Sequence, residues 1–210
     1  MSEADLVFIC NPNNPDGSLR PREDMCALAG SAVKDKGILC ADEAFIELAD
    51  PRQSLVNDMQ DNVLILRSLT KCFSVPGIRF GYGFGNEDLI GKIEASRLPW
   101  TVNAFAEAYA IQAFRHLKDL EKSRELIVKE RVFLTDALAS MGLSCATSHA
   151  NYLLVDTGRN VDALCAMLEK RGILVRNCSS FKLPTKIRVA VRTRDENRCL
   201  LEALAACVRS

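Results

Sequence analysis

The chain has 210 residues, and its 27 lysine and arginine residues balance 27 aspartate and glutamate residues, so the formal net charge at pH 7 is zero. Because no basic run stands out, the composition gives no support to a nucleic-acid or membrane-surface role. Apolar residues make up 48% of the sequence, enough for one ordinary domain or two small ones to bury a core.

Cysteine and histidine usage argues against disulfide and metal frameworks. The nine cysteines are scattered without a C-x-x-C pair, and His116 and His149 lack metal-ligand spacing. No apolar stretch approaches the roughly 18 residues of a membrane span, and the start shows no signal-peptide pattern. We therefore expect reduced thiols in a cytosolic, metal-free protein.

In the first half of the chain, short apolar runs alternate with a helical segment. Runs at residues 6–10, 38–41 and 63–66 each end at turn-forming or polar residues and predict strands buried on both faces. A fourth strand is predicted at 80–84. Apolar residues at helical spacing predict a helix over 21–36 that ends before a glycine. This alternation predicts a parallel or mostly parallel α/β sheet.

The second half has a different pattern, which begins with two long helical stretches. The predicted elements are helices at 102–117 and 120–141, a strand at 152–155, a helix at 161–171, strands at 173–176 and 187–191, and a helix at 195–208. This order predicts a small α+β unit attached to long helices. We place the boundary between two domains near residue 119.

Polar residues follow three of the predicted strands. Ligands of an open α/β sheet bind outside the carboxyl ends of its strands. At those ends the sequence has Asn11 to Asn14, Asp42, and Ser68 to Lys71. An amide, a carboxylate, hydroxyls and an amine at one edge predict a site for a polar, charged small molecule.

Two interpretations of these residues fail. Ser68 and Lys71 match the S-x-x-K pattern of penicillin-recognising enzymes, but the S-D-N and K-T-G companions are absent. Asp42 and Glu43 are adjacent, and alternation along a strand would send them to opposite faces, which disfavours a two-carboxylate glycosidase.

The whole set is explained by a lysine that forms a Schiff base with pyridoxal phosphate. This cofactor needs an amine for its aldehyde, a carboxylate for its ring nitrogen, a donor to its phenolate oxygen, and hydroxyls with an arginine for its phosphate. Residues of these types, in that order, are Lys71, Asp42, Asn14, and Ser68, Thr70 and Arg79.

Three stretches in this order resemble a known family: NPNNPDG (11–17), DEAFIEL (42–48) and SLTKCFSVPGIRFGY (68–82). They look like the fold-type I pyridoxal-phosphate enzymes of the histidinol-phosphate aminotransferase branch. Later stretches, including LPWTVNAFA, HANYLLV, GILVRNCSSF and KIRVAVRT, look closest to threonine-phosphate decarboxylase. The resemblance implies part of an aspartate aminotransferase-like large domain at 1–119 and a small C-terminal α+β domain at 120–210.

The resemblance also implies a role for each matched residue. Lys71 would be the catalytic lysine and Asp42 the partner of the cofactor's ring nitrogen. Asn14 would donate to the phenolate oxygen. The residues implied for the cofactor phosphate are Ser68, Thr70 and Arg79.

For the substrate, Arg188 matches the family's carboxylate-binding arginine, and Arg176, Arg192 and Asn151 are further candidates. On one strand face Arg188 and Arg192 would lie about 13 Å apart, at ~3.3 Å per residue. They would then hold the two ends of a substrate that carries both carboxylate and phosphate. In the alternative, one or both of these residues are surface strand arginines.

The resemblance implies decarboxylation of L-threonine O-3-phosphate to aminopropanol phosphate for cobalamin, or the histidinol-phosphate aminotransferase reaction with the same residues. A small phosphorylated amino acid or amino alcohol is the implied substrate, and a homodimer the implied assembly. Phe45 stands where many aminotransferases of this branch have tyrosine. That difference favours the decarboxylase, and a hydrophobic filler is an equal alternative.

Members of this family carry a long segment before the NPNNP motif, which begins here at residue 11. We therefore expect the phosphate-binding loop, the ring that stacks on the cofactor and the tyrosine that crosses the dimer to be missing from this sequence. The four remaining large-domain strands are expected to form one contiguous piece of sheet with unpaired edges. Two hypotheses follow: an enzyme that begins upstream or is completed by a second polypeptide, and an inactive fragment that pairs with a partner subunit.

Overall fold

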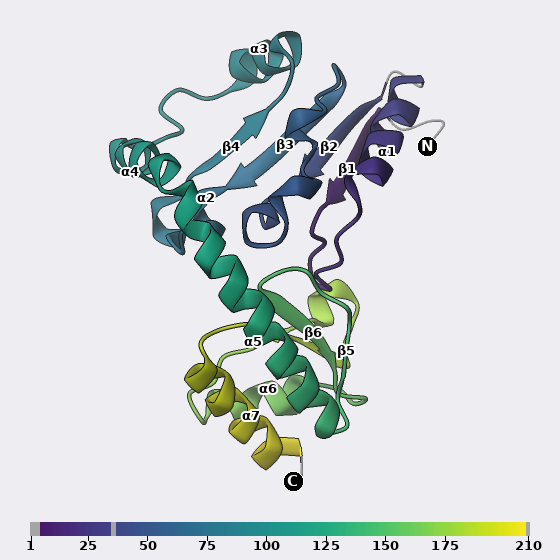
Figure 1. The fold of residues 1–210 in the computed structure, drawn as a ribbon, viewed down its shortest axis with the longest axis vertical. Helices are drawn as coiled ribbons and strands as arrows, with labels where there is room; N and C mark the ends of the chain where they lie inside the picture. Colours follow the sequence, from purple (N-terminus) through teal and green to yellow (C-terminus); the bar gives the residue numbers. More distant parts are fainter. Residues whose placement is uncertain (1–4, 35–36, 209–210) are drawn as a thin grey trace. The chain divides into compact units, whose positions relative to one another are not determined.

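The computed structural model describes residues 5–34 and 37–208 (Figure 1). The chain divides into two compact units. The N-terminal unit comprises residues 1–12 and 19–121, and the C-terminal unit comprises residues 13–18 and 122–210. The division falls in the first turn of the long helix α5 (Leu120–Ser140).

The N-terminal unit contains a four-stranded sheet in the order β1-β2-β3-β4 (Figure 1). Its strands are β1 (Leu6–Cys10), β2 (Ile38–Asp42), β3 (Val63–Ser68) and β4 (Gly81–Phe84). The first three strands run parallel, and β4 is antiparallel to β3. The predicted mostly parallel sheet with one contiguous set of four strands is confirmed. In its register Cys10 lies opposite Asp42, and Asp42 opposite Leu66, so the carboxyl ends of β1, β2 and β3 meet at one edge.

Among its described residues, the N-terminal unit has the α-helices α1 (Arg22–Lys34), α2 (Leu69–Cys72), α3 (Glu87–Ser96) and α4 (Ala104–Arg115). Helix α1 lies where the helix over 21–36 was predicted, and residues 35–36 of that prediction fall outside the described residues. Its fully buried Met25 and Ala29 pack with sheet residues in one core. In residues 5–34 and 37–208 no helix is both long and apolar enough to span a membrane.

Helix α3 was not predicted from the sequence, although its start carries a recognisable signal. The side chain of Asn86 accepts a hydrogen bond from the backbone N–H of Leu89 at 2.8 Å. Glu87 and Asp88 follow in the first turn, where acidic residues favour a helix N-terminus. None of the residues of α3 is buried, but Leu89, Ile90 and Ile93 recur at helical spacing, so the segment could have been recognised as an amphipathic helix.

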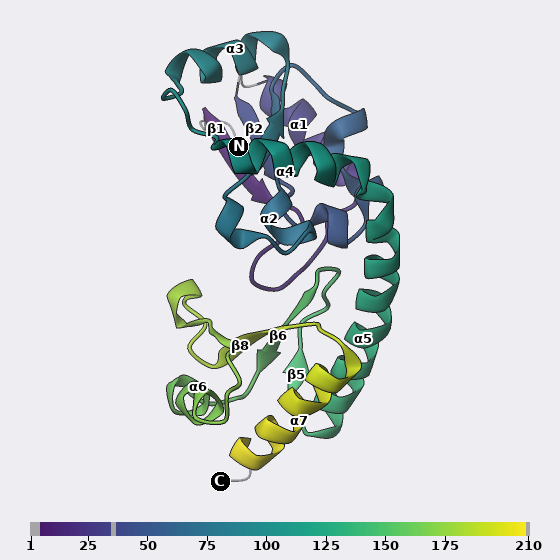
Figure 2. The ribbon, with the colours of Figure 1, turned by 90° about the vertical axis from the view of Figure 1, so that its left-hand side faces the viewer.

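The C-terminal unit is an antiparallel sheet with helices α5, α6 (Asp162–Glu169) and α7 (Arg194–Val208) around it (Figure 2). Its strand order is β5-β6-β8-β7. The strands are β5 (Ser144–Cys145), β6 (Tyr152–Asp156), β7 (Arg176–Asn177) and β8 (Lys186–Ala190). Helices and sheet share one core, whose fully buried members include Leu138, Leu168, Ile187 and Leu204.

Two strand predictions in this unit need correction. The strand predicted at 173–176 is only the two-residue β7, because the N–H of Ile173 donates to the Leu168 carbonyl at the end of α6 rather than to a neighbouring strand. The strand predicted at 187–191 ends at Ala190. The backbone N–H of Arg192 donates to Asn197 of α7 at 3.0 Å, which takes Arg192 off the strand.

The turn segment Asn13–Ser18 belongs to the C-terminal unit although it follows β1 in sequence. The Tyr152 hydroxyl donates to the Asn13 carbonyl at 2.8 Å. The backbone N–H of His149 donates to the Gly17 carbonyl, also at 2.8 Å. The turn is therefore fastened to the segment that leads into β6.

Replacing Gly17 with alanine is expected to destabilise the C-terminal unit. Gly17 has φ of +77°, and an added Cβ would lie 2.8 Å from the Ser148 Cβ. Strained backbone of this kind costs about 1–3 kcal/mol, and the steric clash adds to that cost. Gly142→Ala is the matched control, because Gly142 has φ of +78° with nothing within 4 Å of the added Cβ. Denaturant unfolding should show a larger loss for Gly17→Ala, and equal losses would contradict the clash.

Candidate functional site

Asp42 occupies the end of β2 at the edge where the parallel strands of the N-terminal unit finish. Its Oδ1 accepts the backbone N–H of Ala44 at 3.0 Å, and its Oδ2 accepts the Cys10 thiol at 3.3 Å. The half-buried carboxylate is therefore held at the strand end by two donors. Its remaining acceptor positions suit a protonated ring nitrogen.

Lys71 lies on the single helical turn α2, which follows β3 directly. The turn is anchored by Leu69, which is fully buried, while the Lys71 side chain is exposed. The Lys71 Nζ lies 5.5 Å from the centre of the Phe45 ring. Because Phe45 follows β2, this contact places the amine beside the strand end that carries Asp42.

Ser68 and Thr70 form a pair of hydroxyls at the same strand end. Their Oγ and Oγ1 atoms are 2.7 Å apart, so one donates to the other. Arg79 lies on the turn after α2 with φ of +58°, and its Nη1 donates to the Pro76 carbonyl at 2.9 Å. The structure thus brings Ser68 and Thr70 together, whereas the described contacts of Arg79 are with its own turn.

The cysteines near this edge differ in their roles. The Cys10 thiol donates to Asp42, and the register of β1 against β2 is the feature that places it there. Cys72 is buried, and this burial together with the negative charge of Glu47 raises its pKa to about 11. Cys72 is therefore an unreactive thiol at neutral pH.

Asn14, Arg188 and Arg176 are grouped in the C-terminal unit. Arg188 Nη1 donates to Asn14 Oδ1, and the Arg188 guanidinium lies 4.9 Å from the centre of the Tyr152 ring. Because the Asn14 oxygen is used by Arg188, its NH₂ group remains as the donor. Arg176 lies opposite Arg188 in the β7–β8 register, and its Nη2 donates to Ser180 Oγ at 2.8 Å.

Arg192 and Asn151 are the remaining residues that the sequence suggested for the substrate. Arg192 is exposed and follows β8, so the prediction that it shares a strand face with Arg188 is wrong. Its Nε donates to Glu196 Oε1 at 2.7 Å, because both residues lie at the start of α7. The buried Oδ1 of Asn151 has no hydrogen-bond partner within the described part of the chain. An unsatisfied buried oxygen of this kind suits a donor group of a ligand.

The donor set of the N-terminal unit fits pyridoxal phosphate by its chemistry. Lys71 supplies an amine for the aldehyde, and Asp42 supplies a carboxylate with free acceptor positions for a protonated ring nitrogen. Ser68 and Thr70 supply hydroxyls for the phosphate. All three groups lie at the carboxyl ends of neighbouring strands, where ligands of α/β sheets bind.

Comparison with known proteins identifies the family. The model of the family aminotransferase class I and II matches residues 2–204. The histidinol-phosphate aminotransferase of Symbiobacterium thermophilum is 35% identical over 208 residues, covering 98% of this chain and 57% of its own length. A protein of Caldanaerobacter subterraneus provisionally named threonine-phosphate decarboxylase is 37% identical over 212 residues, covering 97% of this chain and 58% of its own length.

The fold agrees with these similarities in sequence. The crystal structure of histidinol-phosphate aminotransferase from Sinorhizobium meliloti in complex with pyridoxal-5'-phosphate matches with a TM-score of 0.87 and 28% identity, over 98% of this chain and 58% of that chain. This chain therefore spans little more than half the length of the curated relatives it matches. With its mostly parallel sheet and the three ordered motifs, the chain belongs to the class I and II aminotransferase family.

Proposed function

We propose that this chain carries the cofactor lysine and the substrate-binding arginines of a pyridoxal-phosphate-dependent decarboxylase of L-threonine O-3-phosphate. The product would be aminopropanol phosphate, a component used in cobalamin biosynthesis. The observation that carries the proposal is the placement of Asp42 and Lys71 at the ends of neighbouring parallel strands, with the Phe45 ring beside the Lys71 amine.

When bound, pyridoxal phosphate supplies an aldehyde that condenses with amines and a ring that accepts the electron pair released at the substrate Cα. Lys71 would hold this group through its aldehyde. Asp42 would hold the proton on the ring nitrogen, and the Asn14 NH₂ group would donate to the phenolate oxygen. Ser68, Thr70 and Arg79 would bind the phosphate.

The arginine pair of the C-terminal unit is proposed to orient the substrate. Arg176 and Arg188 lie opposite each other on adjacent strands, so two positive charges are available for a substrate with carboxylate and phosphate groups. The two arginines would hold the substrate carboxylate in one orientation, and in a decarboxylase that orientation would favour loss of this group as CO₂.

Histidinol-phosphate aminotransferase is the second candidate, supported by the similarity to relatives of that name. In that reaction Lys71 would carry the Cα proton to the cofactor. Phe45 favours the decarboxylase, because the ring beside Lys71 has no hydroxyl to bind the phenolate oxygen. Relatives of the two names match at nearly the same identity, 35% and 37%, so the preference rests on Phe45.

The activity of the whole protein also depends on what completes the chain, since the relatives are longer. We propose that the active form is a homodimer of the complete fold. The alternative of another class is an inactive fragment or a subunit that works only with a partner polypeptide.

Product analysis tests the proposal. The chain with added pyridoxal phosphate is incubated with L-threonine O-3-phosphate, or with histidinol phosphate and 2-oxoglutarate, and the borohydride-reduced chain serves as the blank. Release of CO₂ with aminopropanol phosphate is the expected result. Amino transfer from histidinol phosphate would favour the second candidate. No turnover of either substrate would favour the partner-dependent subunit.

A further inference from the structure

Next to the strand ends of the candidate site lies a buried polar cluster of Glu43, Glu47, Ser54 and Arg67, here called the Glu43 cluster. Glu43 and Ser54 are each only 1% exposed. The side chains of Arg67 and Glu47 are 9% and 13% exposed. Charged groups are rarely buried to this degree unless they are paired, so the cluster calls for a physical reason.

Donors surround the carboxylate of Glu43. Its Oε2 accepts hydrogen bonds from Ser54 Oγ at 2.6 Å, from Arg67 Nη2 at 3.1 Å and from Arg67 Nε at 3.2 Å. Its Oε1 accepts the backbone N–H of Leu55 at 2.9 Å. This carboxylate has no need of a ligand and its orientation is fixed.

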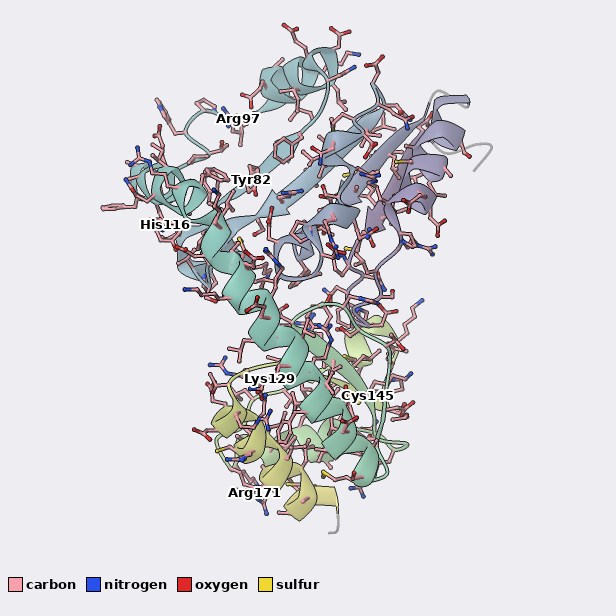
Figure 3. All side chains as sticks on the ribbon, in the orientation of Figure 1. Tyr82, Arg97, His116, Lys129, Cys145 and Arg171 are labelled. Carbon is pink, nitrogen blue, oxygen red and sulfur yellow. The ribbon has the colours of Figure 1, made fainter. Side chains whose placement is uncertain are left out.

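Arg67 connects the cluster to the sheet. It also donates to Ser54 Oγ at 2.7 Å and to Glu47, and its guanidinium lies 5.5 Å from the centre of the Phe84 ring on β4. Tyr82, which projects from β4 (Figure 3), has its pKa raised by burial and by the charge of Glu47. The cluster therefore contacts β4 through Arg67 and the segment at Ser54 and Leu55 through Glu43.

The position of the cluster in the chain relates it to the site. Glu43 follows Asp42 directly, and Arg67 directly precedes Ser68. Lys71 lies three residues after Ser68, on the helical turn α2. Glu43 and Arg67 bind each other where β2 and β3 end, whereas Asp42 and Ser68 bind other partners, Cys10 and Thr70. The backbone N–H of Glu43 also donates to the Leu66 carbonyl at 2.8 Å.

Stability alone does not explain such a cluster. Burying an ion pair costs hydration free energy, and the attraction between the two charges barely offsets that cost. A well-packed apolar pair would therefore stabilise the same strands as well or better. An apolar pair would lack directional hydrogen bonds. The hydrogen bonds between the Arg67 guanidinium and the Glu43 carboxylate allow only one arrangement of the strand ends. The benefit is therefore geometric.

We propose that the Glu43 cluster is a positioning device, which holds Asp42 and Lys71 at the spacing and orientation that capture of the cofactor requires. This inference rests on the proposed function, because it assigns Glu43 and Arg67 a role through Asp42 and Lys71. Neither Glu43 nor Arg67 touches the cofactor. A purely structural role, which would only anchor the segment at residues 54–57, is the competing explanation.

The test compares Glu43→Gln with Glu130→Gln in the full chain. Glu130 is the matched control because its carboxylate is 3% exposed and accepts Arg194 Nε at 2.9 Å and Nη2 at 3.0 Å, in the C-terminal unit. The Arg194 guanidinium holds the pKa of Glu130 below its usual value, as expected for a true ion pair. Both variants remove the charge of a buried carboxylate that is paired with an arginine, although the Arg194 side chain is 36% exposed and that of Arg67 is 9% exposed.

Two spectroscopic readouts follow pyridoxal phosphate on Lys71. For Glu43→Gln we expect about tenfold weaker cofactor binding, the size of effect seen when a partner that orients a ligand is removed. We also expect the pH midpoint of the visible band to shift by about one unit, since that midpoint depends on the charge and distance of Asp42. Glu130→Gln should leave both unchanged. Lower thermal stability of Glu43→Gln with unchanged affinity and midpoint would overturn the inference.

A third readout needs no cofactor and separates this inference from the proposed function. Amide hydrogen exchange should become faster at residues 42–47 and 66–72 in Glu43→Gln and stay unchanged there in Glu130→Gln. If the unaltered chain takes up no cofactor on Lys71, the proposed function fails, and exchange alone decides whether the cluster holds these strand ends. Unchanged exchange overturns the inference. Ser54→Ala, which removes one donor to Glu43, is the milder variant if Glu43→Gln does not fold.

Discussion

Replacing Lys71 with alanine is expected to abolish covalent attachment of pyridoxal phosphate and leave the fold intact. The Lys71 side chain is exposed, so its removal takes little packing from the N-terminal unit. Its amine is the one placed beside the Phe45 ring, at the strand end that carries Asp42. The loss of attachment should therefore be complete rather than partial.

The measurement is borohydride reduction after incubation with the cofactor, followed by peptide mapping. In the unaltered chain the reduced pyridoxyl group should lie on Lys71. Lys71→Arg keeps the positive charge near Phe45 but has no amine that condenses with an aldehyde, so it should behave like Lys71→Ala. Lys129→Ala, on α5 of the C-terminal unit (Figure 3), is the control and should label as the unaltered chain does. Equal labelling of the Lys71 variants would contradict the assigned role.

Much of the N-terminal unit could be predicted because its signals are local. The runs at 6–10, 38–41 and 63–66 are too short and too apolar for surface helices, and each ends in polar residues, so they indicate parallel strands. The prediction that all three are buried on both faces is wrong for β1, because Leu6 and Phe8 are 47% and 67% exposed. Parallel strands have their carboxyl ends at one edge, which brings Asp42 and the loop with Lys71 together before any contact is known. The structure places both there.

What the sequence could not show depends on contacts between distant residues. Ile173 looks like part of a strand, yet its N–H is used by the end of α6. Arg192 has the spacing of a residue on the same strand face as Arg188. Its backbone N–H and its guanidinium instead donate to Asn197 and Glu196 in the first turn of α7. These competing hydrogen bonds are tertiary and leave no trace in hydrophobic periodicity.

The Glu43 cluster shows the same limit at the site itself. Alternation along β2 correctly predicted that Glu43 points away from Asp42. Nothing in the motif indicated that Arg67, 24 residues later, would bind it, because that pairing depends on the β2–β3 register. Cys10 became part of the site for the same reason, through the β1–β2 register.

Replacing Arg67 with methionine is expected to destabilise the N-terminal unit by about 3–5 kcal/mol, the usual cost of breaking a buried pair by removing one partner. Methionine keeps much of the side-chain length and the packing on Phe84, but Glu43 and Glu47 lose the cation that both contact. Two buried carboxylates would then remain without the cation that compensates their charge.

Amide hydrogen exchange of β3 under denaturant measures this loss in the N-terminal unit itself. Arg52→Met is the control, because the Arg52 side chain is 88% exposed in its pair with Asp50 and such pairs contribute about 1 kcal/mol or less. Glu43→Leu combined with Arg67→Met should recover part of the stability, since the combination removes one of the stranded charges. Recovery of stability without recovery of cofactor binding would show that the cluster both stabilises the fold and orients Asp42 and Lys71. Apolar packing can replace the first contribution but not the second. A double variant with full cofactor binding would instead show that packing alone sets the spacing of those two groups.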